Sequence, residues 1–128
     1  MTYWMRCYWA EDDIWFHLEV GDQDMVVRQV ELRGPARVVT AAACDREWQQ
    51  AFTVGAHADY ESRYGSTAEV AVTHWGEGEG FAPQTTTAEE FEDVWTSARA
   101  QIPNVPSSPV RRWPTARESP YAWLVAVL

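Results

Sequence analysis

An alternating stretch at residues 14–20 constrains the fold more than any other part of this sequence. Its even-numbered positions are all apolar: Ile14, Phe16, Leu18 and Val20. Its odd-numbered positions are Trp15, His17 and Glu19. Successive side chains of a β-strand point to opposite faces of a sheet, so this period of two predicts a strand with one buried face.

Short turn signals separate this strand from its neighbours. Residues 3–10 are aromatic and β-compatible, and an acidic turn at residues 11–13 follows them. Residues 21–24 and the Gly34-Pro35 pair mark two more turns, which bound strands at residues 25–32 and 36–43. Short connections favour antiparallel neighbours. A further strand predicted at residues 69–75 makes a sheet of four to five strands.

Two helices are expected. Asp45, Trp48 and Phe52 indicate a short helix, and residues 53–68 read as a loop. The main helix is predicted at residues 87–102, because Thr87 and Glu90 form a capping box and Pro103 ends it. Its apolar residues recur at helical spacing: Ala88, Phe91, Val94, Trp95, Ala98 and Ile102.

We expect this helix to cover the apolar face of the sheet, which makes the fold α+β. The residues expected in the shared core are Ile14, Phe16, Leu18, Val26, Val30, Leu32, Phe91, Val94 and Trp95. A chain of 128 residues suits one domain, placed at residues 1–102. Five prolines then mark residues 103–128 as a Pro-rich arm.

Charge limits the classes of partner. The formal net charge is -9, which disfavours nucleic acids and anionic membranes and suits a basic protein partner. A nucleic-acid binder would need Arg6, Arg28, Arg33 and Arg37 on one face. Every basic residue is an arginine, which is typical of GC-rich genomes such as those of actinobacteria. With no signal-peptide pattern and no apolar run of about 20 residues, we expect a cytoplasmic protein.

The apolar end of the arm needs a cover. Residues 121–128 carry no charged side chain, and burial of one large apolar side chain contributes roughly 1.5–3 kcal/mol. This segment, with Trp123, therefore docks on its own domain, on a partner or in a dimer. Trp113, next to Arg111 and Arg112, belongs to the one basic spot of the arm.

The candidate binding surface is an aromatic and polar face of the sheet. If Phe16 points inward, Trp15 and His17 point outward. The residues expected on this surface are Trp4, Arg6, Tyr8, Trp15, His17, Gln29 and Arg33. Trp, Tyr and Arg carry much of the energy in protein interfaces. The competing interpretation is that a later strand or the arm covers this face, and above all Trp4, Tyr8 and Trp15.

The remaining chemical motifs favour structural roles. His57, Asp59 and His74 have ligand-type side chains but match no specific metal spacing. Cys7 and Cys44 are read as structural thiols, and the acidic start of the main helix as a solvated face. The Gly-Glu alternation at residues 76–80 lacks the setting of a phosphate-binding loop. No cofactor and no catalytic residue is therefore expected.

Three short segments resemble a bacterial family. They are Tyr3-Trp4, the strand Val27-Arg28-Gln29-Val30-Glu31-Leu32 with its Gly34 turn, and Glu89-Glu90-Phe91-Glu92-Asp93-Val94-Trp95. They are similar to DUF6881, a small bacterial domain family of unknown function, over residues 1–43 and 85–100. The resemblance implies a single α+β domain, in some members beside toxin-immunity or defence genes, with no established catalytic residues.

Two functions from different classes follow. The first is a non-enzymatic protein-binding module of the immunity or accessory type, which uses the aromatic sheet face and the C-terminal arm, in a protein complex or a homodimer. The alternative is a small-ligand-binding protein or an enzyme of a biosynthetic pathway, with a Trp-lined pocket between sheet and helix. An open aromatic face favours the first, and a closed apolar cavity near His57 or His74 favours the second.

Overall fold

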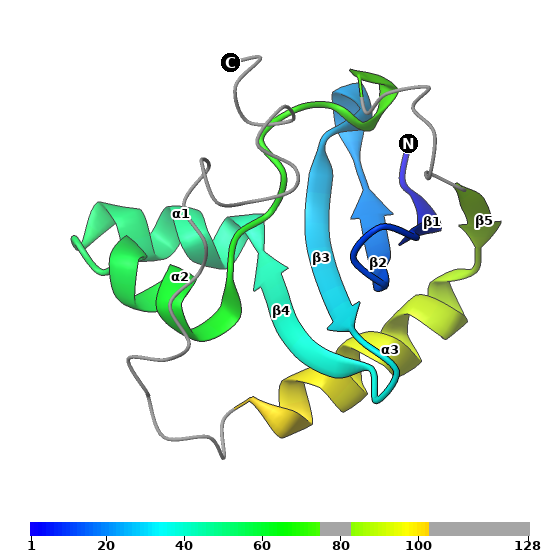
Figure 1. Cartoon of the computed structure of the whole chain (residues 1–128). Coiled ribbons are helices and arrows are strands. Elements are labelled where there is room, and N and C mark those ends of the chain that lie inside the picture. Colours follow the sequence, from blue (N-terminus) through cyan, green and yellow to red (C-terminus); the bar gives the residue numbers. More distant parts are fainter. Residues whose placement is uncertain (75–82, 103–128) are drawn as a thin grey trace.

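Five strands form one antiparallel sheet in the computed structural model, which describes residues 1–74 and 83–102 (Figure 1). The strands are β1 (Tyr3–Trp9), β2 (Ile14–Val20), β3 (Val26–Arg33), β4 (Val38–Cys44) and β5 (Gln84–Thr86). Their order in the sheet is β4-β3-β2-β1-β5, so β1 to β4 form the predicted meander. The predicted α+β class and the size of the sheet are confirmed. The arm at residues 103–128 lies outside the described residues.

Three helices accompany the sheet: α1 (Asp45–Thr53), α2 (His57–Tyr64) and α3 (Ala88–Gln101). The predictions of α1 and α3 are confirmed. The loop predicted at residues 53–68 is wrong, because it contains α2, a short helix with no fully buried residue. The strand predicted at residues 69–75 is also wrong, since Val72–His74 is a 3₁₀ turn and the fifth strand is the polar β5.

The register of the strands decides which residues share a face. Phe16 lies opposite Glu31, and His17 lies opposite Val30, across the β2–β3 pair. Opposed residues of antiparallel strands point to the same side of the sheet. We call the two sides the Phe16 face, with Ile14, Phe16, Leu18 and Val20 of β2, and the His17 face, with Trp15, His17 and Glu19 of β2.

Helix α3 packs on the His17 face, so the prediction that it covers the Phe16 face is wrong. Val30 and Ala42 of the sheet form a buried cluster with Ala98 and Ile102 of the helix end. Phe91 is fully buried. Figure 1 shows α3 passing behind β3 and β4. The helix begins as predicted, because the Thr87 hydroxyl accepts a hydrogen bond from the Glu90 N–H at 3.1 Å.

A bulge in β3 contributed to the wrong assignment. Glu19 pairs with Arg28 but Val20 pairs with Val26, so Val27 is an extra residue. An extra residue interrupts the alternation of side chains along a strand. Val26 therefore joins the cluster of the Phe16 face, whereas Val30 and Leu32 of the same strand lie under α3.

The segment after α2 covers the Phe16 face. Ala68 and Val72 pack against the buried side chains of β1 and β2, and Val70 is buried as well. The Ala68 N–H donates a hydrogen bond to Gln29 Oε1 at 2.9 Å. Around β2 and β3 the sheet is thus packed on both sides. The polar residue Glu31 of β3 therefore has no solvated side to occupy.

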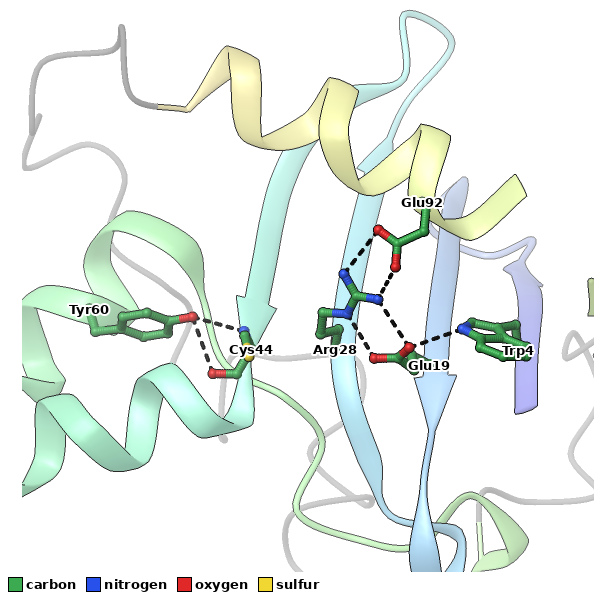
Figure 2. Close-up of polar contacts among 6 residues, drawn as sticks. All are labelled: Trp4, Glu19, Arg28, Cys44, Tyr60 and Glu92. Atoms are coloured by element: carbon green, nitrogen blue, oxygen red, sulfur yellow. Dashed lines mark hydrogen bonds and ion pairs between the residues drawn. The ribbon is translucent and has the colours of Figure 1, made fainter. Parts of the chain in front are cut away.

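Side chains occupy the outer edge of β4. The Tyr60 hydroxyl accepts a hydrogen bond from the Cys44 N–H at 2.8 Å (Figure 2). Arg99 of α3 donates from Nε to the Ala42 carbonyl at 2.8 Å. An open strand edge is a template for pairing with another chain, so these contacts satisfy backbone groups that would otherwise invite it.

Candidate functional site

Five of the seven residues expected on the aromatic and polar surface lie together on the His17 face. Tyr8 is opposite Trp15, Arg6 is opposite His17, and Trp4 is opposite Glu19. Alternation along two neighbouring strands therefore places Trp4, Arg6 and Tyr8 of β1 beside Trp15 and His17 of β2, as expected. Arg6 is exposed to solvent, and the other four are half-buried.

The rings at the centre of this group contact one another. Tyr8 and Trp15 have ring centroids 5.0 Å apart and tilted by 37°. The Arg6 guanidinium lies over the Trp15 ring, 5.7 Å from the ring centroid. The His17 ring, two residues further along β2, has its centroid 6.4 Å from that of Trp15. We call Arg6, Tyr8, Trp15 and His17 the Trp15 cluster. Tilted aromatic pairs and arginine over an indole are favourable arrangements.

Two turns fix the rim of the Trp15 cluster. The Tyr8 hydroxyl donates to Asp13 Oδ1 at 2.9 Å, and Arg37 donates to the same oxygen at 2.7 Å. Hydrogen bonds from Arg37 and Tyr8 lower the pKa of Asp13. Arg37 also donates to the Gly34 carbonyl at 2.6 Å. The β1–β2 and β3–β4 turns are therefore tied together beside Tyr8.

The other side of the cluster is fixed by β5. Arg6 Nε donates to the Gln84 side-chain oxygen at 2.9 Å, and the two residues are opposed across the β1–β5 pair. Gln84 is distant from Arg6 in sequence, so this contact exists only in the fold. It holds the guanidinium above the Trp15 ring.

His17 is uncharged at neutral pH. Burial, with the nearby Arg6 cation, lowers the pKa of its imidazole to about 4. The Glu90 carboxylate of α3 acts in the opposite direction but does not outweigh burial. The Trp15 cluster therefore offers an aromatic surface with one cationic group, the Arg6 guanidinium.

Trp4 has a different role from the rest of the predicted set. Its Nε1 donates to Glu19 Oε2 at 3.1 Å, and Arg28 Nε donates to Glu19 Oε1 at 2.7 Å (Figure 2). Arg28 also forms an ion pair with Glu92 of α3, with one Nη1–Oε2 contact at 3.3 Å. Hydrogen bonding to Arg28 lowers the pKa of Glu19. Trp4 thus belongs to the anchor of α3.

Aromatic rings of α3 pack against the guanidinium groups of this anchor. The Arg28 guanidinium lies 4.8 Å from the Phe91 ring centroid and 5.0 Å from that of Trp95. On the other side of Trp95, the Arg99 guanidinium lies 4.4 Å from the same ring. The helix is held by alternating guanidinium and aromatic groups.

The remaining predicted binding residues lie elsewhere. Arg33 is opposite Ile14, so it points to the Phe16 face and is separated from the Trp15 cluster by the sheet. Gln29 lies on the Phe16 face too, opposite Leu18. Trp113 and Trp123 fall outside the described residues.

Two features were missed by the sequence interpretation. Glu31 is fully buried, and neither of its carboxylate oxygens has a hydrogen-bond partner in the described part of the chain. Burial raises the pKa of this carboxyl to about 8, and the opposing effect of the nearby Arg33 is smaller.

The second feature is an aromatic group on α1 and α2, where the ring centroids of Trp48 and Phe52 lie 5.4 Å apart in a stacked arrangement. Only its spacing of four residues was visible in the sequence.

The candidate metal and nucleophile residues are dispersed. Over residues 1–74 and 83–102, no group of three His, Cys, Asp or Glu side chains is placed to hold a metal ion. His57 packs against Phe52 at 5.0 Å. Burial raises the pKa of the Cys7 thiol to about 12, so it stays protonated at neutral pH. Cys44 is half-buried, where β4 meets α1.

None of the helices in these same ranges is long and apolar enough to cross a membrane. The glycine-rich residues 76–80 fall outside the described ranges. Comparison with protein-family models, curated proteins and solved structures finds no match for this chain. The resemblance to DUF6881 therefore stays a prediction.

Proposed function

We propose that this chain is a non-enzymatic protein-binding module of the accessory or immunity type, acting in the cytoplasm, and that the Trp15 cluster is its recognition surface. The observation that carries the proposal is the contact of Tyr8, Trp15 and Arg6 on adjacent strands, with the arginine exposed. These are the residue types that dominate binding energy at protein interfaces.

Preorganisation supports the proposal. The three side chains stand on paired strands rather than on a loop, and hydrogen bonds to Asp13 and Gln84 fix two of them. Side chains that are already ordered lose little entropy on binding, so more of the contact energy appears as affinity. If this surface only covered the core, the exposed Arg6 guanidinium would not need the hydrogen bond that orders it.

Charge supports a basic partner. The net charge of -9 attracts a positively charged protein over long range and raises the rate of encounter. The uncharged His17 and the aromatic rings then provide apolar contact at the centre. Long-range acidic steering and the local aromatic centre act at different distances.

The test is native co-purification of the full chain from its source cell, followed by quantitative mass spectrometry. The variant is Tyr8→Ala with Trp15→Ala. The matched control is Tyr3→Ala, because Tyr3 also lies on β1 and donates a 2.9 Å hydrogen bond to an aspartate, but packs with the Phe16 face.

We expect a stoichiometric protein partner with the wild type and with Tyr3→Ala, and its loss with the double variant. Recovery of the chain alone in all three preparations would contradict a protein-binding role. Equal recovery of the partner with the double variant would show that another surface binds it.

A further inference from the structure

The α1–α2 hairpin carries a second apolar surface that the Trp15 cluster does not use. We call Trp48, Phe52, Val54 and His57 the Phe52 patch. Phe52 stacks on Trp48 at 5.4 Å and lies 5.0 Å from the His57 ring. Phe52 is nevertheless 55% exposed and Val54 is 77% exposed. Helix α1 has no fully buried residue, and Trp48 is half-buried.

The patch offers an occupant apolar contact rather than hydrogen bonds. The Trp48 Nε1 and the His57 Nδ1 atoms are shielded from solvent and have no partner among the described residues. What remains accessible is the Phe52 ring and the Val54 side chain. Phe52 is the one aromatic residue among the large exposed hydrophobic side chains of the described ranges. Exposed apolar side chains of this kind are candidates for a docking site.

The chain itself contains a segment with the matching chemistry. Residues 121–128 read Tyr-Ala-Trp-Leu-Val-Ala-Val-Leu and carry no charged side chain. In water this segment would expose several large apolar side chains, and burial of each would lower the free energy. It needs an apolar surface, and the Phe52 patch is one.

The tether starts on the same α1–α2 hairpin, at the end opposite to the patch. Helix α3 ends at the α1–α2 hairpin, because Arg99 in its last turn donates to Glu47 of α1 at 2.5 Å and lies 4.0 Å from the Tyr64 ring of α2. Residues 103–120 then separate Ile102 from the apolar segment. A Pro-rich chain spans about 3.1 Å per residue, so this tether reaches on the order of 50 Å and passes the length of α1 easily. A short tether also keeps the segment at a local concentration of roughly millimolar.

We propose that residues 121–128 dock on the Phe52 patch of the same chain. The Trp15 cluster is then left open for a partner, which distinguishes this arrangement from one in which the arm covers Trp15. The inference concerns a different surface from the proposed function and does not depend on it.

Limited proteolysis of the full chain by chymotrypsin tests the proposal, with cleavage after Tyr121, Trp123 and Leu124 followed by mass spectrometry. The variant is Phe52→Ser with Val54→Ser. The matched control is Val38→Ser, since Val38 is also a well-exposed valine, at 54%, but lies at the start of β4. Size-exclusion chromatography with light scattering reports the mass of each sample.

We expect a monomer whose bonds at residues 121–124 are cleaved at least tenfold faster in the double variant than in the wild type or Val38→Ser. The exposure of the two substituted side chains keeps the fold intact, which circular dichroism checks. A Val54→Asp variant gives the same readout with a single change. Fast cleavage of the wild type, or protection that survives the substitutions, would overturn the proposal. A wild-type dimer that the double variant dissociates would overturn it in favour of a second copy as the occupant.

Discussion

Glu31 lies in the middle of β3 with its side chain fully buried on the Phe16 face. Burial disfavours the charged form of this carboxyl more strongly than the neighbouring Arg33 and Gln29 side chains favour it, so the group takes its neutral form. Its pKa of about 8 lies above the ordinary value of 4.5 because of burial. At neutral pH the folded chain therefore holds a protonated glutamic acid, while the unfolded chain holds a carboxylate.

This difference makes stability depend on pH. The contribution of Glu31 is fully present below about pH 4.5 and is lost as the pH rises towards 8, because the unfolded state releases the proton first. One pKa unit corresponds to about 1.4 kcal/mol, so the loss is on the order of several kcal/mol. We expect urea unfolding at pH 5 and pH 8 to show this fall in the wild type and a much smaller one in Glu31→Gln.

Glu69→Gln is the control, since Glu69 is exposed on the segment that covers the same face. It should keep the pH dependence of the wild type. Parallel stability curves for Glu31→Gln and the wild type between pH 5 and pH 8 would contradict the account of a buried neutral acid.

At the scale of elements, the sequence predicts the existence of strands and helices better than their partners. Residues 14–20 form β2 because their alternation is strict, and Thr87 begins α3 because its hydroxyl caps the helix. The alternation in β1 and β2 also predicts that Tyr8 and Trp15 share a face. These features depend on residues close together in the sequence.

The side on which α3 packs depends on contacts that are distant in sequence. The bulge at Val27 and the ion pair between Arg28 and Glu92 become visible only when the strands are paired. Glu31 alternates with the apolar Val30 and Leu32, a pattern typical of a strand with one solvated side, but the sheet is packed on both sides there. The alternation of apolar and polar residues along a strand shows that its two sides differ. It does not show which helix or loop covers each side.

Arg28 is expected to hold α3 on the sheet. Its side chain is 17% exposed and that of Glu19 is 15% exposed, so Arg28→Met leaves a partly buried carboxylate without its cation. We expect a loss of about 2–4 kcal/mol in the free energy of unfolding. Arg37→Met is the control, because Arg37 and Asp13 are also 2.7 Å apart but are 41% and 35% exposed. It should cost less than about 1 kcal/mol.

Chemical denaturation of both variants at low ionic strength measures the two values. A loss for Arg28→Met no greater than that for Arg37→Met would mean that the guanidinium–aromatic contacts do not hold the helix.

At the scale of the whole molecule, the His17 face of the sheet carries two kinds of surface. Helix α3 packs on the His17 face, where its Glu92 pairs with Arg28, but the Arg6 guanidinium in the middle of β1 stays exposed. The tryptophan-rich sheet thus contributes one aromatic group to the anchor of α3 and another to a candidate interface. The Phe52 patch lies apart from both, on the α1–α2 hairpin.

The most direct measurement is the dissociation constant of the co-purified partner by isothermal titration calorimetry, for the wild type, Trp15→Ala and Tyr3→Ala. If the Trp15 cluster is the centre of the interface, Trp15→Ala raises Kd at least tenfold, which corresponds to about 1.4 kcal/mol, while Tyr3→Ala stays within about twofold of the wild type. An unchanged Kd for Trp15→Ala, with its fold intact, would contradict the assignment of this surface.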